Sequence, residues 1–351
     1  MISNSIKKAS VFACIALLSM QLCAQAPQTY KHAGEYIDYV NKQQAAVNKK
    51  YVKFQSTSAH SSKERKARKD FNNLLEEVQK SEGNIRSMPP FNNNRAFRDS
   101  AASFFKLYNI TLQKDYNKVV DMQEIADQSY DLMEAYFTAR DLVSAKLENQ
   151  GEMLNVELKK FGEANNVKII DGTDDSDIGK MMKKIGEVNS YYDPIYLNFF
   201  KVYKQYAYLS DAIATKNVGS IEQNKNTLQQ FATEALTKIN SFGSYKSDNS
   251  LVNTSKKLIE NYLKFANEKV QPQLDFLIAD ENFKKLDAEM KKKTNRTKAD
   301  VDNFNAEVNN LNKLVAKSNE AGAFNNNVIN PSLDNFNKAV SNFFSTYIPV
   351  Y

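Results

Sequence analysis

Histidine, cysteine and glycine-rich motifs, the usual sources of catalytic and metal-binding groups, are scarce in this chain. Its two histidines, His32 and His60, stand far apart, and neither follows a glutamate at the Glu-x-x-His spacing of di-iron bundles. The His-Glu-x-x-His pattern of zinc sites, a phosphate-binding glycine loop and the Gly-x-Ser-x-Gly turn are also absent. We predict no catalytic, cofactor-binding or metal-binding residue, and we interpret both histidines as surface residues. The 41 acidic residues leave catalysis by paired carboxylates open.

The segment best able to offer a binding surface is the aromatic-rich stretch between Tyr191 and Ile213. Its apolar residues form two adjacent stripes at helical spacing, which is typical of a helix buried between two layers. We interpret it as a core helix joining two halves of the protein, with tyrosine hydroxyls at its edges. The alternative is an exposed aromatic platform for a glycan or a peptide. The aromatic residues concerned are Tyr191, Tyr192, Tyr196, Phe199, Phe200, Tyr203, Tyr206 and Tyr208.

Three short motifs suggest other chemistry, and each has an ordinary structural explanation. Lys63–Lys69 carries five basic residues that could contact lipid headgroups, an anionic glycan or an acidic partner, although we interpret it as a solvated surface. Asp171–Asp177 is acidic, but its spacing does not match a calcium-binding EF-hand loop, so we interpret it as a linker. Asp99-Ser100-Ala101 resembles the O-glycosylation acceptor of exported Bacteroidetes proteins, and we interpret it as a helix start.

The first residues are typical of an export signal. Two lysines precede the apolar stretch Val11–Leu22, which is too short to span a bilayer. We predict a signal peptide over residues 1–24 with cleavage after Ala24, and therefore an extracytoplasmic location in the periplasm, at the cell surface or outside the cell. Both cysteines, Cys14 and Cys23, would be removed with it. Lipid attachment is the alternative, but Leu22 before Cys23 is not the small residue that such a site needs.

Composition restricts the partners that we expect. Only 10 Gly and 7 Pro in 351 residues indicate few tight turns, and 42% hydrophobic residues suffice for a core. The net charge of +6, less the two signal-peptide lysines, leaves about +4, too balanced for a nucleic-acid-binding face. No apolar run after residue 26 approaches the roughly 20 residues of a membrane span. We predict no nucleic-acid partner and no transmembrane segment in the mature chain.

Apolar residues recur every three or four positions along almost the whole chain, the spacing of helices packed side by side. We predict an all-α protein of about eight long amphipathic helices. Asp121 should cap the longest helix, and Pro331 should kink the last one. Strand-like alternation occurs only at Val167–Ile170. The predicted helices are Tyr36–Phe54, Phe71–Met88, Phe97–Val120, Met122–Phe161, Ile178–Ile213, Ile221–Phe242, Leu251–Met290 and Val301–Tyr347.

Comparing the chain with itself at an offset of 154 residues indicates a duplication. The offset aligns the helix-breaking Pro89-Pro90 with Gly243 without a gap, and it aligns apolar residues on both sides of this break. We therefore predict two tandem, packed helical bundles, at 27–168 and 177–351, or one elongated bundle if the long helices run through both. The aligned pairs include Leu74 with Leu228, Ile85 with Ile239, Phe97 with Leu251 and Phe105 with Ile259.

Three segments, Asp121–Tyr136, Phe199–Leu209 and Ile221–Leu228, resemble parts of a family of exported all-helical proteins of Bacteroidetes and spirochaetes. The similarity covers roughly Tyr36 to the C-terminus. The members are described only as surface proteins. The resemblance implies an all-α fold and an extracytoplasmic or surface location, and it supplies no catalytic residue.

These observations favour an exported, non-enzymatic interaction or structural protein whose partner is an unknown protein or glycan of the cell envelope. The alternative from another class is an enzyme that uses carboxylates and tyrosine hydroxyls in a cleft between helices. A pore-forming toxin would need an apolar hairpin able to enter lipid, and none occurs after residue 26. A deep pocket with converging buried acids would favour the enzyme, whereas a filled core would favour the binding protein.

Overall fold

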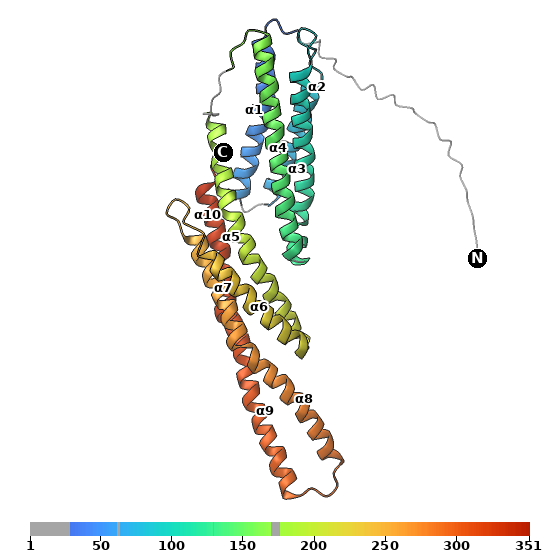
Figure 1. The fold of residues 1–351 in the computed structure, drawn as a ribbon. Helices are drawn as coiled ribbons and strands as arrows, with labels where there is room; N and C mark the ends of the chain where they lie inside the picture. The colour runs from blue at the N-terminus through green and yellow to red at the C-terminus, as the bar shows by residue number, and fades with distance from the viewer. Residues whose placement is uncertain (1–28, 62–63, 129, 170–175) are drawn as a thin grey trace, which may run out of the picture.

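The protein is an elongated assembly of long α-helices (Figure 1). The computed structural model describes residues 29–61, 64–128, 130–169 and 176–351. Within these ranges the fold is all-α, as the sequence predicts, and extended pairing is limited to two isolated β-bridges inside turns. Val167–Ile169, part of the one strand candidate, is irregular, and Ile170 lies outside the described residues.

The first four helices pack in chain order, α1 on α2, α2 on α3 and α3 on α4. Tyr36 of α1 closes this group, because its ring lies 5.3 Å from the ring of Phe161 on α4. Phe91 and Phe97 complete the aromatic contacts around it. The bounds are α1 (Ala33–His60), α2 (Glu64–Arg86), α3 (Ala96–Gln128) and α4 (Tyr130–Ala164).

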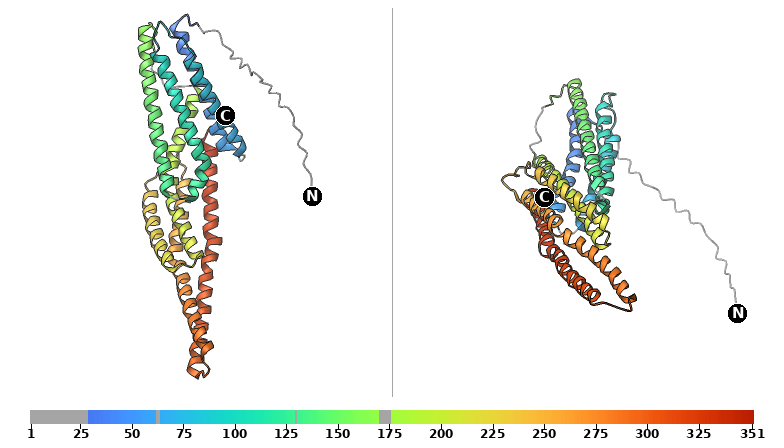
Figure 2. Two further views of the ribbon diagram at one scale, coloured as in Figure 1. Left: turned by 90° about the vertical axis from the view of Figure 1, so that its right-hand side faces the viewer. Right: turned by 60° about the horizontal axis from the view of Figure 1, so that its bottom comes forward.

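The second group is organised around α5, which packs on α6, α7 and α10 and also contacts α1 and α4. Beyond this group α8 and α9 form a hairpin that extends away from the other helices, and α9, η1 and α10 follow one another as a single long rod (Figure 2). The bounds are α5 (Asp177–Ala214), α6 (Val218–Ile239), α7 (Ser250–Glu268), α8 (Val270–Lys292), α9 (Lys298–Phe324), the π-helical turn η1 (Asn325–Ile329) and α10 (Asn330–Tyr347).

A shared core ties the end of α1 to the second group. Val52 of α1 is fully buried in a cluster that includes Ile195 of α5 and Phe343 of α10. The last residues of the structure lie against α1: Lys53 Nζ donates to a main-chain oxygen of Tyr351 over 2.7 Å, and the Tyr351 amide donates to Ser56 Oγ over 2.9 Å. The C-terminal residues are therefore held against the last turns of α1 by packing and by hydrogen bonds.

Three predicted helix boundaries differ from the structure. Helix α3 runs through Asp121 to Gln128, because no glycine or proline between these positions interrupts its hydrogen-bond ladder, so the predicted helix start at Asp121 is wrong. The predicted helix Leu251–Met290 is divided at Lys269, since Pro272 cannot donate to the carbonyl of Glu268. The irregularity expected at Pro331 is the π-turn η1, which precedes the proline.

Two turns of the same geometry connect α2 to α3 and α6 to α7. In the first, Phe91 and Asn94 exchange backbone hydrogen bonds of 3.1 and 2.9 Å; in the second, Tyr245 and Asp248 exchange bonds of 3.0 and 2.8 Å. The two residues inside each turn have positive φ, at 48° and 60° in the first and at 49° and 71° in the second. Each turn then caps the next helix, since Asn94 Oδ1 accepts from the Ala96 amide and Asp248 Oδ1 from the Ser250 amide.

Candidate functional site

The aromatic segment Tyr191–Ile213 lies in α5, and most of it is core. Phe199 is 4% exposed, and its ring centroid lies 4.3 Å from that of Phe336 on α10. Tyr206 packs in the same way on Tyr262 of α7, with ring centroids 4.5 Å apart. Tyr208, at 39% exposed, is the most accessible of these rings. The prediction of a core helix is therefore confirmed for Phe199, and its aromatic residues do not form a continuous exposed platform.

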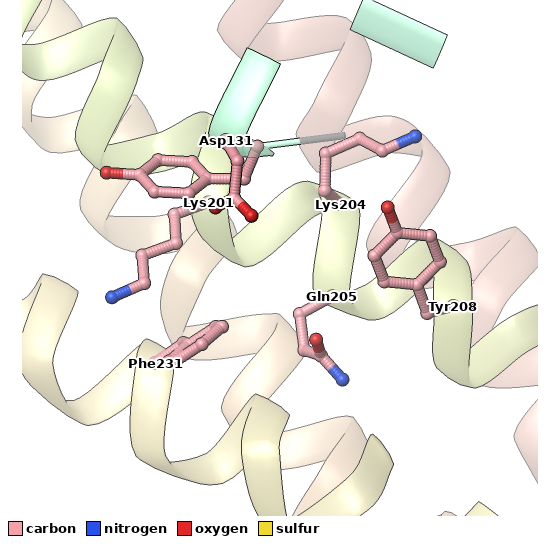
Figure 3. A pocket seen from close by; sticks show the side chains of 7 residues that line it. Asp131, Lys201, Lys204, Gln205, Tyr208 and Phe231 are labelled. Carbon is pink, nitrogen blue, oxygen red and sulfur yellow. The ribbon is translucent and has the colours of Figure 1, made fainter. Parts of the chain in front are cut away.

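A pocket of about 400 Å³ opens where α4, α5 and α6 meet. Helix α5 supplies most of its lining, because Lys201, Lys204, Gln205 and Tyr208 project from successive turns on one side. Figure 3 shows Lys201 and Phe231 on one side of this pocket and Lys204 and Tyr208 on the other. The complete lining is Tyr130, Asp131, Lys201, Lys204, Gln205, Tyr208 and Phe231.

Lys201 has a fixed position in the pocket wall. Its Nζ lies 4.0 Å from the centre of the Phe231 ring and 5.7 Å from that of Tyr130, which are cation–π distances. The same atom lies 3.3 Å from Glu234 Oε2. The pKa of the Glu234 carboxyl is lowered, first by the hydrogen bond from Gln230 and then by Lys201. The lysine thus presents a positive charge that already has a carboxylate partner.

The other polar groups of the pocket are also held in place. Lys204 and Gln205 are both buried, and Gln205 Nε2 donates to Asn224 Oδ1 over 2.8 Å. Lys204 Nζ lies 5.3 Å from the centre of the Tyr208 ring. The Tyr130 hydroxyl donates to Glu134 Oε1 over 3.1 Å, and burial, followed by this hydrogen bond, raises the tyrosine pKa to about 12. Tyr130 therefore stays protonated at neutral pH.

This arrangement suits binding better than acid–base catalysis. Asp131 is the carboxylate in the lining, and it is exposed, so its surroundings do not resemble those that convert a buried acid into a proton donor. Two ammonium groups, an amide and three aromatic rings can together contact a ligand that has a flat or apolar face and hydrogen-bonding groups. Within the described part of the chain, no group of three or more His, Cys, Asp or Glu residues could hold a metal ion.

The residues singled out in the sequence do not gather at this pocket. His32 and His60 are both exposed, and His60 Nε2 lies 2.9 Å from the carbonyl oxygen of Ile348 near the C-terminus. Arg65, Lys66, Arg68 and Lys69 are exposed at the start of α2, and Lys63 lies outside the described residues. The acidic linker is also outside them up to Asp175.

The O-glycosylation motif is part of the first turns of α3. Asp99 is exposed and lies 2.7 Å from Arg98 Nη2, whereas Ala101 is fully buried. Helix geometry and a buried third residue agree with the interpretation of this motif as a helix start.

Sequence analysis missed the pocket, although one signal was present. Lys201 and Lys204 interrupt the aromatic stripes of α5, and a lysine among buried aromatic residues either reaches solvent or lines a cavity. The lining from the other two helices includes Tyr130 and Phe231, whose approach to α5 depends on tertiary packing.

Comparison of the chain with protein-family models, with curated proteins and with solved structures found no match. Among the described residues, no helix combines the length and the apolar character needed to cross a membrane.

Proposed function

We propose that this protein is exported and acts outside the cytoplasm as a non-enzymatic interaction or structural protein. The observation that best supports the proposal is the way the helices use their aromatic residues. Rings such as Phe199, Phe200 and Tyr262 fill the cores, while the hairpin α8–α9 presents most of its surface to solvent. A long helical body of this kind offers extended faces to a partner, which we propose is a protein or glycan of the cell envelope.

The pocket between α4, α5 and α6 supports the same proposal. Its lysines and aromatic rings can contact a ligand, and its one lining carboxylate is exposed. An enzyme with carboxylates and tyrosine hydroxyls would be indicated by several acids converging below the surface. The described lining does not have that composition.

Export is tested by fractionating cells that produce the full chain and determining the N-terminal residue of the purified protein. We expect an extracytoplasmic fraction and a chain that begins at Gln25, after removal of residues 1–24. Protease treatment of intact cells then separates a surface location from the periplasm. Recovery in the cytosol with Met1 retained would contradict the proposal.

We also propose that the chain consists of two tandem, packed helical bundles, 27–168 and 177–351, that arose by duplication. The two turns that join α2 to α3 and α6 to α7 support this, because their residues are 154 positions apart and have the same hydrogen bonds and signs of φ. Burial follows the same offset. The pairs in which both residues are almost completely buried include Leu74 with Leu228, Ile85 with Ile239, Phe97 with Leu251 and Phe105 with Ile259.

The bundle boundaries are tested by producing residues 27–168 alone. We expect a helical circular dichroism spectrum and a cooperative melting curve, at a lower temperature than in the whole chain because Val52 loses its partners on α5 and α10. A fragment without helical signal would show that the first four helices are not an independent bundle.

A further inference from the structure

The hairpin α8–α9 is held together by a narrow seam. The rings of Phe283 and Phe304 meet across it at 5.3 Å, and ion pairs join Lys269 to Glu320 at its base and Lys293 to Asp300 at its tip. No side chain between Lys298 and Glu320 is buried in the described structure. The seam therefore leaves much of the surface of α9 in contact with solvent.

Helix α9 carries a second stripe beside this seam. Its members follow alternating steps of four and three residues, the spacing of a and d positions in a coiled coil, with valine at d and asparagine at a. Val308 is half-buried, whereas the other members are exposed, including Val301 at 42% and Val315 at 36%. This Val/Asn stripe consists of Val301, Asn305, Val308, Asn312, Val315 and Asn319.

The Val/Asn stripe contains no charged residue, which is unusual for the exposed face of a helix. At about 100° per residue, the acids and lysines of α9 fall on other sides of the helix. Position 316, which also borders the stripe, is alanine. The charged residues between Val301 and Ala323 are Asp302, Glu307, Lys313, Lys317 and Glu320.

We propose that the Val/Asn stripe is a dimer interface, on which α9 of a second copy of this chain packs in parallel about a two-fold axis. In a parallel pair about such an axis, the a and d residues that line the axis lie opposite their own copies. A charged face would then bring like charges together, whereas this stripe brings valine to valine and asparagine to asparagine. Each asparagine amide has both a donor and an acceptor, so two copies satisfy each other across the axis.

The orientation follows from the same pattern. In a parallel pair a positions meet a positions, so the Asn312 side chains of the two copies face each other, as single asparagines do in parallel coiled coils. In an antiparallel pair each a position would face a d position. Each asparagine would then lie against a valine, without a hydrogen-bonding partner. Three asparagines in a short interface make the dimer weak.

The test is sedimentation equilibrium of the whole chain over a range of about 10 to about 1,000 µM. We expect reversible dimerisation that Asn312→Lys weakens ~10-fold or more, because it places two ammonium groups opposite each other. Asn310→Lys is the matched control: it adds the same charge to the same exposed helix, about 200° away from Asn312. Dimerisation of this control should be unchanged.

Disulfide formation tests the orientation. Asn312→Cys is introduced into a chain in which Cys14 and Cys23 are replaced by serine, so that the new thiol is the only one. Under oxidation it should cross-link faster than Asn310→Cys, because facing a positions lie within disulfide reach. A protein that stays monomeric throughout, or equal cross-linking by the two variants, would overturn the proposal. Either result leaves the export proposal intact, since export is measured by cell fractionation.

Discussion

The hydroxyl of Tyr36 donates a hydrogen bond of 2.9 Å to the carbonyl oxygen of Pro89, linking the first turn of α1 to the connection between α2 and α3. A second tyrosine makes the corresponding bond in the other group of helices, where the Tyr191 hydroxyl donates to the Gly243 carbonyl over 2.7 Å. Pro89 and Gly243 are 154 positions apart and precede equivalent turns. In both halves, therefore, a tyrosine from the first helix holds the start of the connection between the second and third.

Replacing Tyr36 by phenylalanine tests this link. The ring contacts stay, but the hydrogen bond to Pro89 is lost, so the free energy of unfolding should fall by about 1 kcal/mol. Urea unfolding of the two proteins measures the difference. Tyr39→Phe is the control on the same helix, since its hydroxyl makes no hydrogen bond to another described residue, and it should change stability by less than about 0.5 kcal/mol. Equal effects of the two substitutions would contradict the assignment.

The core role of α5 predicts a large effect for Phe199→Ala. Removing a ring that is 4% exposed and packed on Phe336 leaves a cavity, which should lower the free energy of unfolding by about 3–5 kcal/mol. Tyr206→Ala should have a similar effect because it deletes the contact with Tyr262. Tyr208→Ala, at a partly exposed ring on the same helix, is expected to cost much less. A Phe199→Ala melting curve that matches that of the unmodified protein would contradict the core role and favour the alternative of an exposed aromatic platform.

Two glycines of α4 should respond in opposite directions to alanine. A Cβ at Gly162 would lie 2.7 Å from the carbonyl oxygen of Val167, so Gly162→Ala should lower the free energy of unfolding by about 1–3 kcal/mol. At Gly151 the nearest atom is Phe104 Cε2 at 3.9 Å, an ordinary contact, and alanine should stabilise the helix by about 0.5–1 kcal/mol. Thermal melts of the two variants decide this, and a stabilising Gly162→Ala would be inconsistent with the packing at the end of α4.

Stability should fall at alkaline pH because of buried tyrosines. Burial is the main cause that raises the pKa of Tyr36 and of Tyr196 from 10.0 to about 12. The unfolded chain therefore loses these protons at lower pH than the folded protein does. Their contribution to stability is complete below pH 10 and is lost as the pH rises towards about 12. Urea unfolding at pH 9, 10 and 11 measures this loss, and Tyr36→Phe should make it less steep; an unchanged pH dependence would contradict the role of Tyr36.

The features of this structure that could be predicted are those that follow from the spacing of apolar residues along the chain. Stripes at helical spacing identified α5 as a core helix, and the offset of 154 residues aligned two turns that have the same geometry. The break before α8 could also have been predicted. Pro272 is visible in the sequence, and proline has no backbone N–H to continue the helical hydrogen bonds. The π-turn η1 is different: Asn325–Ile329 carries no glycine or proline, and η1 packs on α7, a contact that depends on tertiary structure.

The pocket could not be derived from the sequence for a related reason. From the sequence around it, Lys201 is expected to be one solvated lysine of an amphipathic helix. Its stacking on Phe231 depends on the approach of α6. Nothing at position 231 distinguishes that ring from one that faces the core. A site formed by side chains from three helices depends on how those helices pack, and the pattern of apolar residues along one helix does not specify that packing.

The docking of the last residues on α1 has a consequence for the order of folding. The Tyr351 amide and Ser56 Oγ are separated by 295 positions, and Val52 shares its core with Phe343. When the chain emerges from the ribosome, the end of α1 cannot acquire these contacts until α10 and the residues that follow it have been synthesised. Until α10 has been synthesised, the apolar residues at the end of α1 lack part of their native packing. The native packing of α1 therefore depends on the synthesis of α10, and a product truncated before α10 leaves those residues available to chaperones and proteases.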